Sequence, residues 1–456
     1  MIEMKKTTRV TALTALCAMV TVFAAACGNS GSSEGNSGGD KAKTGSEAVA
    51  PAVPKEPVEL LFYTQYSNLL SQLSDEGFMN DFGQYMKKKY PNFTFKTIFG
   101  ATTKETLQTV VTAKTPIDMI QISPVQTFTF VDLGVASDIS DQVKKNKLDT
   151  SKLEPSTLDL MTRAANNQLV GLPYQINSLI MFYNKDLFDK FGVAYPKDNM
   201  TWETTVDLVK RLTRQDGGVQ YVGFGVQQGW ANILRSNQLS LEPMNNTTRK
   251  TSYDSPDWKR MLEMLLPIYQ VPGNDYRADA ASIDLFQKSQ LAMIIAYPEF
   301  YQRIPGNVNW DMVTAPMMKD KPGVNFAPVP LVLAPVAYSS KRDAAFLAIS
   351  EMLSEEVQLT RARKYGLASV LNDPKFHNDI GADVAALKGK NRQVMQPLNM
   401  AKPITFSPYT GDAMSGIGAA FTDIITGKKD VNTALRDQAD TVDKKIAQLV
   451  ESRGGK

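Results

Sequence analysis

His377 is the only histidine in this chain of 456 residues, which limits the catalytic chemistry available. A serine–histidine–carboxylate triad would need it, yet no Gly-x-Ser-x-Gly turn follows residue 57 to present a serine. We interpret His377 as a surface residue near the turn at Pro374. Both cysteines precede residue 28, so the usual zinc sites lack ligands, and no EF-hand spacing offers a calcium loop. We expect no metal.

Nucleotide chemistry also lacks a recognisable site, because the glycines do not form a phosphate loop or a dinucleotide-binding fingerprint. We therefore expect no cofactor. The 47 acidic residues leave one enzymatic route open, since glycoside hydrolysis needs only two carboxylates held at the right separation. A surface-anchored glycoside hydrolase or lyase that uses paired carboxylates stays as the alternative function.

Cys27 follows three alanines and a short apolar run, and it is the last cysteine in the chain. Residues 1–26 have the basic start and apolar middle of a secretory signal peptide, too short to span a membrane. The segment resembles a bacterial lipobox, although Ala24 stands where that motif usually carries leucine. We predict that Cys27 is lipidated, and that residues 27–57, rich in glycine and serine, form a disordered tether.

The rest of the chain is large enough for two lobes. The formal charge of the whole chain is +3, which gives no reason to expect nucleic acid as a partner. After the signal is removed, no second cysteine remains to pair with Cys27. Stability must then come from packing rather than from an internal disulfide.

Apolar segments with strand-like and helical spacing alternate along the body, which is typical of an α/β fold. The patterns predict strands at 58–63, 93–99, 118–122 and 179–183 and helices at 78–90 and 107–113. Three further helices are expected at 202–212, 344–365 and 435–449, the first with Thr201 as its N-cap.

The body also carries many aromatic and amide side chains at turn positions, a combination suited to sugars. Aromatic rings stack on the apolar faces of a pyranose, and amides and carboxylates pair with its hydroxyls. Any one such residue is more often a packing residue than a ligand contact.

Several segments in order resemble the family 1 extracellular solute-binding proteins, the sugar receptors of ABC importers. The central signature is 171–174 followed by 179–188, and 286–293 resembles a later block with Ser289 and Leu291 substituted. Matching shorter segments are 90–92, 116–120, 191–193, 201–203 and 339–346. The resemblance extends over about residues 58–450.

The resemblance implies an α/β, two-lobe periplasmic-binding-protein-like fold with hinge strands and an interlobe ligand cleft. It assigns 58–174 and 331–368 to one lobe and 175–330 and 369–456 to the other. It also implies a monomer, anchored on the outer face of the cytoplasmic membrane, that binds a sugar or oligosaccharide unchanged and delivers it to ABC permease subunits. Ligand binding would close the lobes.

Candidate ligand contacts follow from that geometry, because open α/β sheets place ligands at the carboxyl ends of their strands. The candidates are Tyr63, Gln65, Tyr66, Gln121, Ser123, Tyr174, Gln175, Trp230, Tyr297, Glu299 and Tyr409. Trp230 is expected to be an exposed aromatic in a glycine-rich loop. Tyr297 and Glu299 lie where many relatives carry a tryptophan that stacks on sugar. Asp118, Asn184 and Trp202 match the signature but are interpreted as fold residues.

Overall fold

The computed structural model describes residues 54–453 except 65–73, 101–105 and 166. These residues belong to one compact unit, Val49–Lys456. The signal segment, Cys27, nearly all of the tether, Gln65 and Tyr66 lie outside the described residues.

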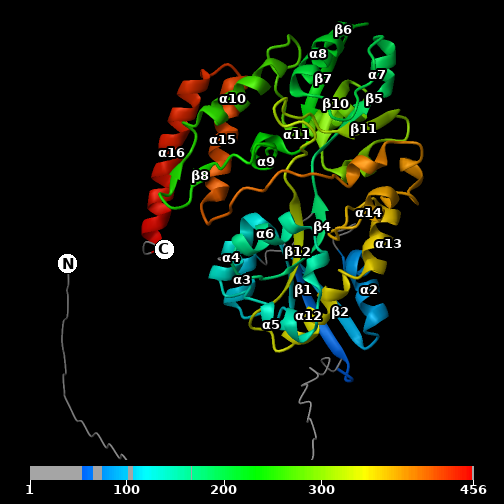
Figure 1. The fold of residues 1–456 in the computed structure, drawn as a ribbon, viewed down its shortest axis with the longest axis vertical. Helices are drawn as coiled ribbons and strands as arrows, with labels where there is room; N and C mark the ends of the chain where they lie inside the picture. Colours follow the sequence, from blue (N-terminus) through cyan, green and yellow to red (C-terminus); the bar gives the residue numbers. More distant parts are fainter. Residues whose placement is uncertain (1–53, 65–73, 101–105, 166, 454–456) are drawn as a thin grey trace, which may run out of the picture. The chain divides into compact units, whose positions relative to one another are not determined.

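Two five-stranded sheets organise this unit (Figure 1). The first has the order β2 (Phe93–Phe99), β1 (Val58–Thr64), β3 (Met119–Ile122), β12 (Val329–Pro335) and β4 (Leu172–Asn177). The second has the order β11 (Trp310–Thr314), β5 (Ile180–Asn184), β10 (Leu291–Ala296), β7 (Val219–Val226) and β6 (Arg214–Asp216). A separate pair joins β8 (Met244–Asn245) and β9 (Lys250–Thr251).

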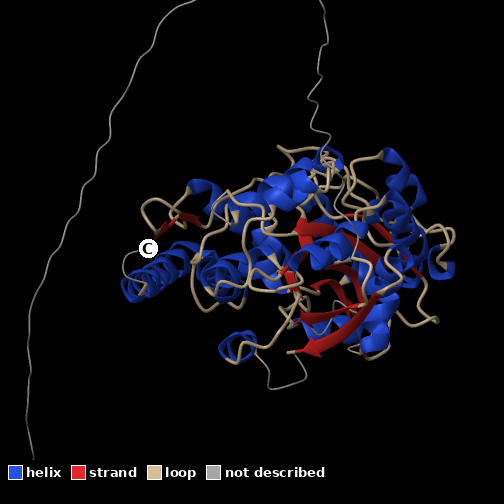
Figure 2. Ribbon diagram, turned by 90° about the horizontal axis from the view of Figure 1, so that it is seen from below, coloured by secondary structure: helices blue, strands red, loops and turns tan. Residues whose placement is uncertain are grey.

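Helices lie on both sides of the strands, as Figure 2 shows. Those of the N-terminal part, up to β4, are α1 (Asp75–Phe78), α2 (Gln84–Lys89), α3 (Leu107–Thr112), α4 (Thr127–Asp132), α5 (Ser140–Lys145) and α6 (Pro155–Arg163). Between β5 and β12 are α7 (Lys185–Lys190), α8 (Trp202–Leu212), α9 (Gly229–Arg235), α10 (Pro256–Leu265) and α11 (Asp279–Gln287). After β12 come α12 (Arg342–Glu351), α13 (Glu355–Tyr365), α14 (Pro374–Asp379), α15 (Thr410–Ile425) and α16 (Val431–Ser452).

The predicted strands are confirmed to within a residue or two, because their apolar runs are buried. Every residue of β3, β4, β5 and β10 is buried, as expected for strands covered on both faces. The helix at 202–212 is also confirmed, and the Thr201 hydroxyl accepts a hydrogen bond from the Thr204 amide. The C-terminal helix is longer than predicted.

Two helix predictions need correction. The single helix expected at 344–365 is two helices, α12 and α13, because the Ser354 hydroxyl caps a new helix by accepting a hydrogen bond from the Val357 amide. Glu355 and Glu356 then occupy its first turn, where acidic side chains stabilise a helix N-terminus. The helix expected at 78–90 is divided by a π-helical segment, Met79–Gly83, between α1 and α2.

Two segments of the chain link the two sheets. Ser178 and Leu179 alone link β4 to β5, and residues 315–328 link β11 to β12. A third segment leads from α13 towards α15. These connections touch one another. The Ser178 hydroxyl donates to the Phe326 carbonyl at 3.3 Å, and the Ile176 amide donates to the Ala368 carbonyl at 3.2 Å.

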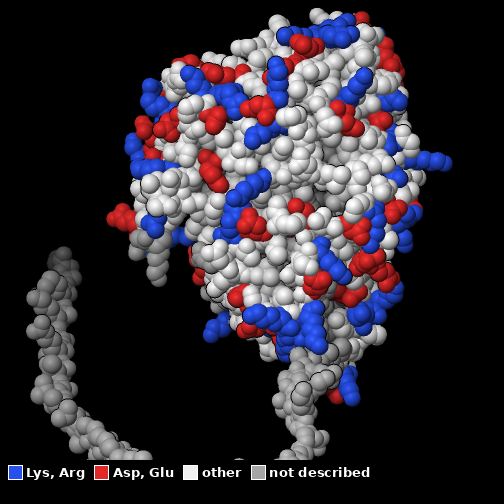
Figure 3. Space-filling view, viewed as in Figure 1, with Lys and Arg blue, Asp and Glu red and all other residues white. Residues whose placement is uncertain are grey.

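Acidic and basic side chains are interspersed over the face shown in Figure 3. Within the described part of the chain, no helix has the length and apolar character needed to cross a membrane. The same residues contain no cluster of histidine, cysteine and carboxylate side chains suited to a metal ion.

Candidate functional site

A cavity of about 380 Å³ lies where strands of both sheets end. Its volume falls within the range of small-molecule sites. Ser123 follows β3, Gln227 and Gln228 follow β7, and Tyr297 follows β10, so strand ends supply much of its polar lining. This is the placement expected for ligands of open α/β sheets. The other lining residues are Pro124, Val125, Leu160, Asn177, Asn232, Arg235, Ser236, Glu299, Phe300, Gln302, Arg303, Ala327, Pro328, Val329, Leu331, Pro403, Ile404 and Phe406.

Amide side chains in the cavity are held by local hydrogen bonds. The Gln227 side-chain oxygen accepts from the Tyr297 amide at 3.2 Å, which ties the end of β7 to the end of β10. The Asn232 side chain, on α9, donates to the carbonyl of Gln228, the N-cap of that helix, at 2.8 Å. These contacts fix donors and acceptors beside a partly exposed tyrosine ring, so the cavity presents both surfaces that a sugar requires.

Glu299 connects the cavity to a buried arginine through Gln175. The Gln175 side-chain nitrogen donates to Glu299 Oε1 at 2.8 Å, and its oxygen accepts from Arg361 Nη2 at 3.1 Å. Arg361 also donates to the Tyr174 carbonyl at 2.9 Å. Burial raises the pKa of Glu299, opposed by hydrogen bonds from its own backbone, Asn177 and Gln175. Burial likewise lowers the pKa of Arg361.

Three predicted contacts, Ser123, Tyr297 and Glu299, line this cavity, and Gln175 lies directly behind Glu299. Burial raises the pKa of Tyr297, and the nearby Arg235 guanidinium opposes that shift through its charge and a hydrogen bond.

Three other candidates are buried beneath the first sheet's surface and are not among the lining residues. Tyr63, Gln121 and Tyr174 are each at most 1% exposed. The Gln121 side chain donates to the Tyr174 hydroxyl and accepts from Thr64 Oγ1. The Tyr174 ring packs edge-on against Phe82 at a centroid distance of 5.1 Å. These contacts are those of packed core residues.

The expectation of an exposed loop aromatic at Trp230 is wrong. Trp230 lies in α9 and is 2% exposed, because α9 packs against α15 and encloses the indole. Its nitrogen donates to the Tyr269 hydroxyl at 2.9 Å, and its ring lies 4.8 Å from that of Phe421. Tyr409 is 4% exposed just before α15, with the Arg453 guanidinium 5.9 Å from its ring centroid. Both lie outside the set of lining residues.

Sequence reasoning missed several polar residues of the cavity. Gln227 and Gln228 follow a strand directly, and the argument from strand ends that selected Ser123 would have found them. Asn232 and Arg235 are one turn apart on α9, but no apolar periodicity marks which side of a short helix meets a cavity. Asn177 lies at the end of β4. Every residue of this strand is buried, so burial does not distinguish Asn177 as a residue that lines the cavity.

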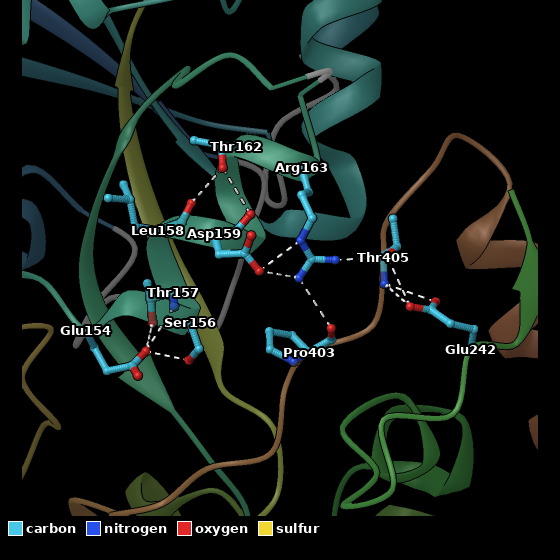
Figure 4. Close-up of polar contacts among 10 residues, drawn as sticks. All are labelled: Glu154, Ser156, Thr157, Leu158, Asp159, Thr162, Arg163, Glu242, Pro403 and Thr405. Carbon is cyan, nitrogen blue, oxygen red and sulfur yellow. Dashed lines mark hydrogen bonds and ion pairs between the residues drawn. The ribbon is translucent and has the colours of Figure 1, made fainter.

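A second set of polar contacts joins α6 to the segment that carries Ile404 (Figure 4). Arg163 Nη1 donates to Thr405 Oγ1 at 2.9 Å, and Asp159 holds the same guanidinium through Nη2 at 2.7 Å. Glu242 accepts from both the amide and the hydroxyl of Thr405. Burial raises the pKa of Glu242, opposed first by these Thr405 hydrogen bonds. Since Leu160 and Ile404 line the cavity, these contacts brace its wall.

A family model described as bacterial extracellular solute-binding protein matches residues 71–359. A binding protein of Brucella abortus is 34% identical over 125 residues, and the match spans 26% of this chain and 28% of that relative. A match to the sn-glycerol-3-phosphate-binding periplasmic protein of Shigella flexneri is 22% identical and spans 32% of this chain and 35% of the relative. The chain thus matches about a third or less of each of these curated relatives.

Solved structures agree over nearly the whole body. An ABC substrate-binding protein of Listeria monocytogenes, in complex with cycloalternan, matches with a TM-score of 0.67 at 19% sequence identity. The match covers 86% of this chain and 100% of the Listeria chain. The sugar-binding protein MalE of Xanthomonas citri has a TM-score of 0.67 at 16% identity, covering 88% and 100%. These likenesses confirm the predicted two-lobed α/β fold. The family and these neighbours are substrate-binding proteins rather than enzymes.

We predict that Glu299→Gln changes how stability depends on pH. The folded-state pKa of Glu299 is raised above its ordinary value of 4.5, so this carboxyl keeps its proton to higher pH in the folded protein than in the unfolded chain. The protonated carboxyl contributes fully to the stability of the folded protein below the unfolded-state pKa. This contribution is lost as pH rises through the folded-state pKa. Urea unfolding at several pH values should show wild type losing stability relative to Glu299→Gln as pH rises from about 4 to about 8. A difference that stays constant across that range would contradict the assignment.

We also predict that Thr405→Val destabilises the protein by about 1–2 kcal/mol, because Arg163 and Glu242 both lose the hydroxyl with which they pair. Valine preserves the shape of the side chain, and its backbone amide can still donate to Glu242. Thr405→Ser keeps the hydroxyl and serves as the matched control, with most of the stability retained. Equal unfolding free energies for the valine and serine variants would show that the hydroxyl does not brace this wall.

Proposed function

Because the chain belongs to the family of bacterial extracellular solute-binding proteins, we propose that it is the substrate-binding component of an ABC importer for a carbohydrate. The cavity at the strand ends is the observation that carries this proposal. It combines a tyrosine ring with amide and carboxylate groups of defined orientation. An oligosaccharide fits this combination best, because stacking and hydroxyl pairing can repeat along successive sugar units.

In this proposal, residues 58–174 and 331–368 form one lobe and residues 175–330 and 369–456 form the other. The membership of the two sheets supports a division into two lobes, since β1 to β4 and β12 lie in one sheet and β5 to β7, β10 and β11 in the other. The proposed boundaries at 174 and 330 fall inside β4 and β12. Ligand held by both lobes would favour the closed arrangement, and a membrane permease would recognise that form. The protein acts as a monomer and returns its ligand chemically unchanged.

Within the cavity, Tyr297 stacks on a sugar ring while Ser123 and Glu299 pair with hydroxyls. Gln175 acts from behind by orienting Glu299, to which it donates at 2.8 Å. Gln65 and Tyr66 stay proposed contacts because they follow β1. Tyr63, Gln121, Tyr174, Trp230 and Tyr409 support the surrounding packing, and any contact of theirs with ligand would require rearrangement.

A thermal-unfolding screen against neutral and charged mono-, di- and oligosaccharides tests the proposal. Ligand at about 100 times its dissociation constant adds about 2.7 kcal/mol to the stability of the native state. Tyr297→Ala should weaken binding about tenfold or more through loss of stacking, equivalent to about 1.4 kcal/mol. Tyr338→Ala is the matched control, because Tyr338 is 44% exposed and does not line the cavity. Release of a cleaved sugar, or no stabilisation by any carbohydrate, would contradict the proposal.

We further propose that Cys27 is lipidated and holds the body to the outer face of the cytoplasmic membrane. The lipobox-like sequence that ends at Cys27 supports lipidation of this residue. The two or three acyl chains of a bacterial lipoprotein would hold the protein to a membrane far more durably than a single chain. Expressed in bacteria, wild type should fractionate with membranes and Cys27→Ser should be released into the medium or periplasm. Cys17→Ser, within the signal segment, is the control and should stay with membranes. Membrane retention of Cys27→Ser would rule out this anchor.

A further inference from the structure

Arg235 places a partly buried positive charge on the wall of the cavity. It ends α9 and lines the cavity together with Asn232, one turn earlier on the same helix. The Tyr297 side chain lies close enough for the charge of Arg235 and a hydrogen bond from it to oppose the rise that burial causes in the Tyr297 pKa. A neutral hydroxyl can accept a hydrogen bond from only one of the five N–H donors of a guanidinium, and it does not neutralise the positive charge.

Arg235 has no carboxylate partner among the described residues. In that part of the chain, Arg163, Arg260, Arg363, Arg436 and Arg453 form ion pairs with carboxylates, whereas Arg235 does not. A second cavity residue, Arg303, is likewise absent from these pairs and is exposed at the end of the 3-10 helix Pro298–Arg303.

The only carboxylate among the lining residues of the described cavity is Glu299, and it faces a different cation. Glu299 is joined through Gln175 to Arg361, whose guanidinium lies in the core behind the cavity. Two arginines therefore face at most one carboxylate, and the cavity lining carries excess positive charge.

We propose that the ligand of this cavity is a sugar bearing an anionic group, a carboxylate or a phosphate, and that Arg235 pairs with that group. The proposal rests on the proposed function and specifies its substrate class. A guanidinium binds carboxylate and phosphate oxygens through two parallel N–H donors, and the pair strengthens as water leaves a closing cavity. A neutral sugar would instead leave the charge of Arg235 desolvated and uncompensated.

The neighbours of Arg235 suit the rest of such a ligand. Asn232 and Gln228 line the same cavity, and the Tyr297 side chain lies close enough to Arg235 for the guanidinium to influence its pKa. An acidic sugar could thus place its anionic group on Arg235, its ring on Tyr297 and its hydroxyls on the amides. Arg303, at the exposed side, would attract the ligand before it is seated.

Isothermal titration with three ligands of similar size tests this assignment: an unsubstituted disaccharide, a disaccharide with a uronic acid unit, and a disaccharide phosphate. Wild type should bind one of the acidic ligands at least tenfold more tightly than the neutral one, and which acid wins distinguishes carboxylate from phosphate. That affinity should fall as salt is raised from 50 mM to 500 mM, because the pair is screened.

Arg235→Gln should lose about tenfold to a hundredfold in affinity for the preferred acidic ligand and change binding of the neutral sugar by less than about threefold. Arg235→Lys keeps the charge and should retain part of the preference. Arg260→Gln is the matched control, since it removes an exposed arginine from outside the cavity. Thermal unfolding of each variant without ligand confirms that it is folded.

Neutral sugars binding as tightly as acidic ones, or Arg235→Gln weakening both classes equally, would overturn this inference and leave the proposed function standing. In that case Arg235 would orient Tyr297 or pair with hydroxyls. Failure of all carbohydrates to bind would instead overturn the proposed function, and this inference with it.

Discussion

The cavity depends on one buried amide, Gln175, which stands between two opposite charges. Arg361 and Glu299 do not touch, yet each pairs with one end of this side chain, at 3.1 Å and 2.8 Å. Burying an arginine and a glutamate is costly unless their donors and acceptors are satisfied. A glutamine can accept from one and donate to the other, whereas an ionised carboxylate, an ammonium group or an apolar side chain cannot do both. Because Gln175 lies on β4, the network ties the cavity floor to α13.

Much of the fold could be predicted from sequence because its signals are local. Apolar runs marked the strand starts at 58 and 93 and, to within one residue, the start at 119, and Thr201 correctly indicated the N-cap of α8. The break between α12 and α13 was missed because Ser354 caps a helix inside an otherwise continuous helical pattern. A capping serine followed by two glutamates is a recognisable signal, but apolar spacing outweighed it in the prediction.

The site could be predicted only in part, since sequence order does not show which side of an element meets the cavity. Ser123, Tyr297 and Glu299 were identified because they follow strands or align with the family pattern. Trp230 was misjudged, because neighbouring glycines suggested a loop where α9 begins and packs against α15. No sequence pattern marked Arg235 as a residue of the site. Its importance arises from the absence of a carboxylate partner among the described residues, a property of three-dimensional placement.

The order of strands in the first sheet has a consequence for biosynthesis. β12 lies between β3 and β4 and is antiparallel to both, although it is made long after them. Until Val329 and its successors emerge from the ribosome, both earlier strands lack the neighbour that completes their ladders. Unpaired strand edges can associate with other chains, and strand pairings between segments far apart in sequence form slowly. A nascent chain of this topology therefore stays unfinished for most of its synthesis, a delay compatible with export before folding.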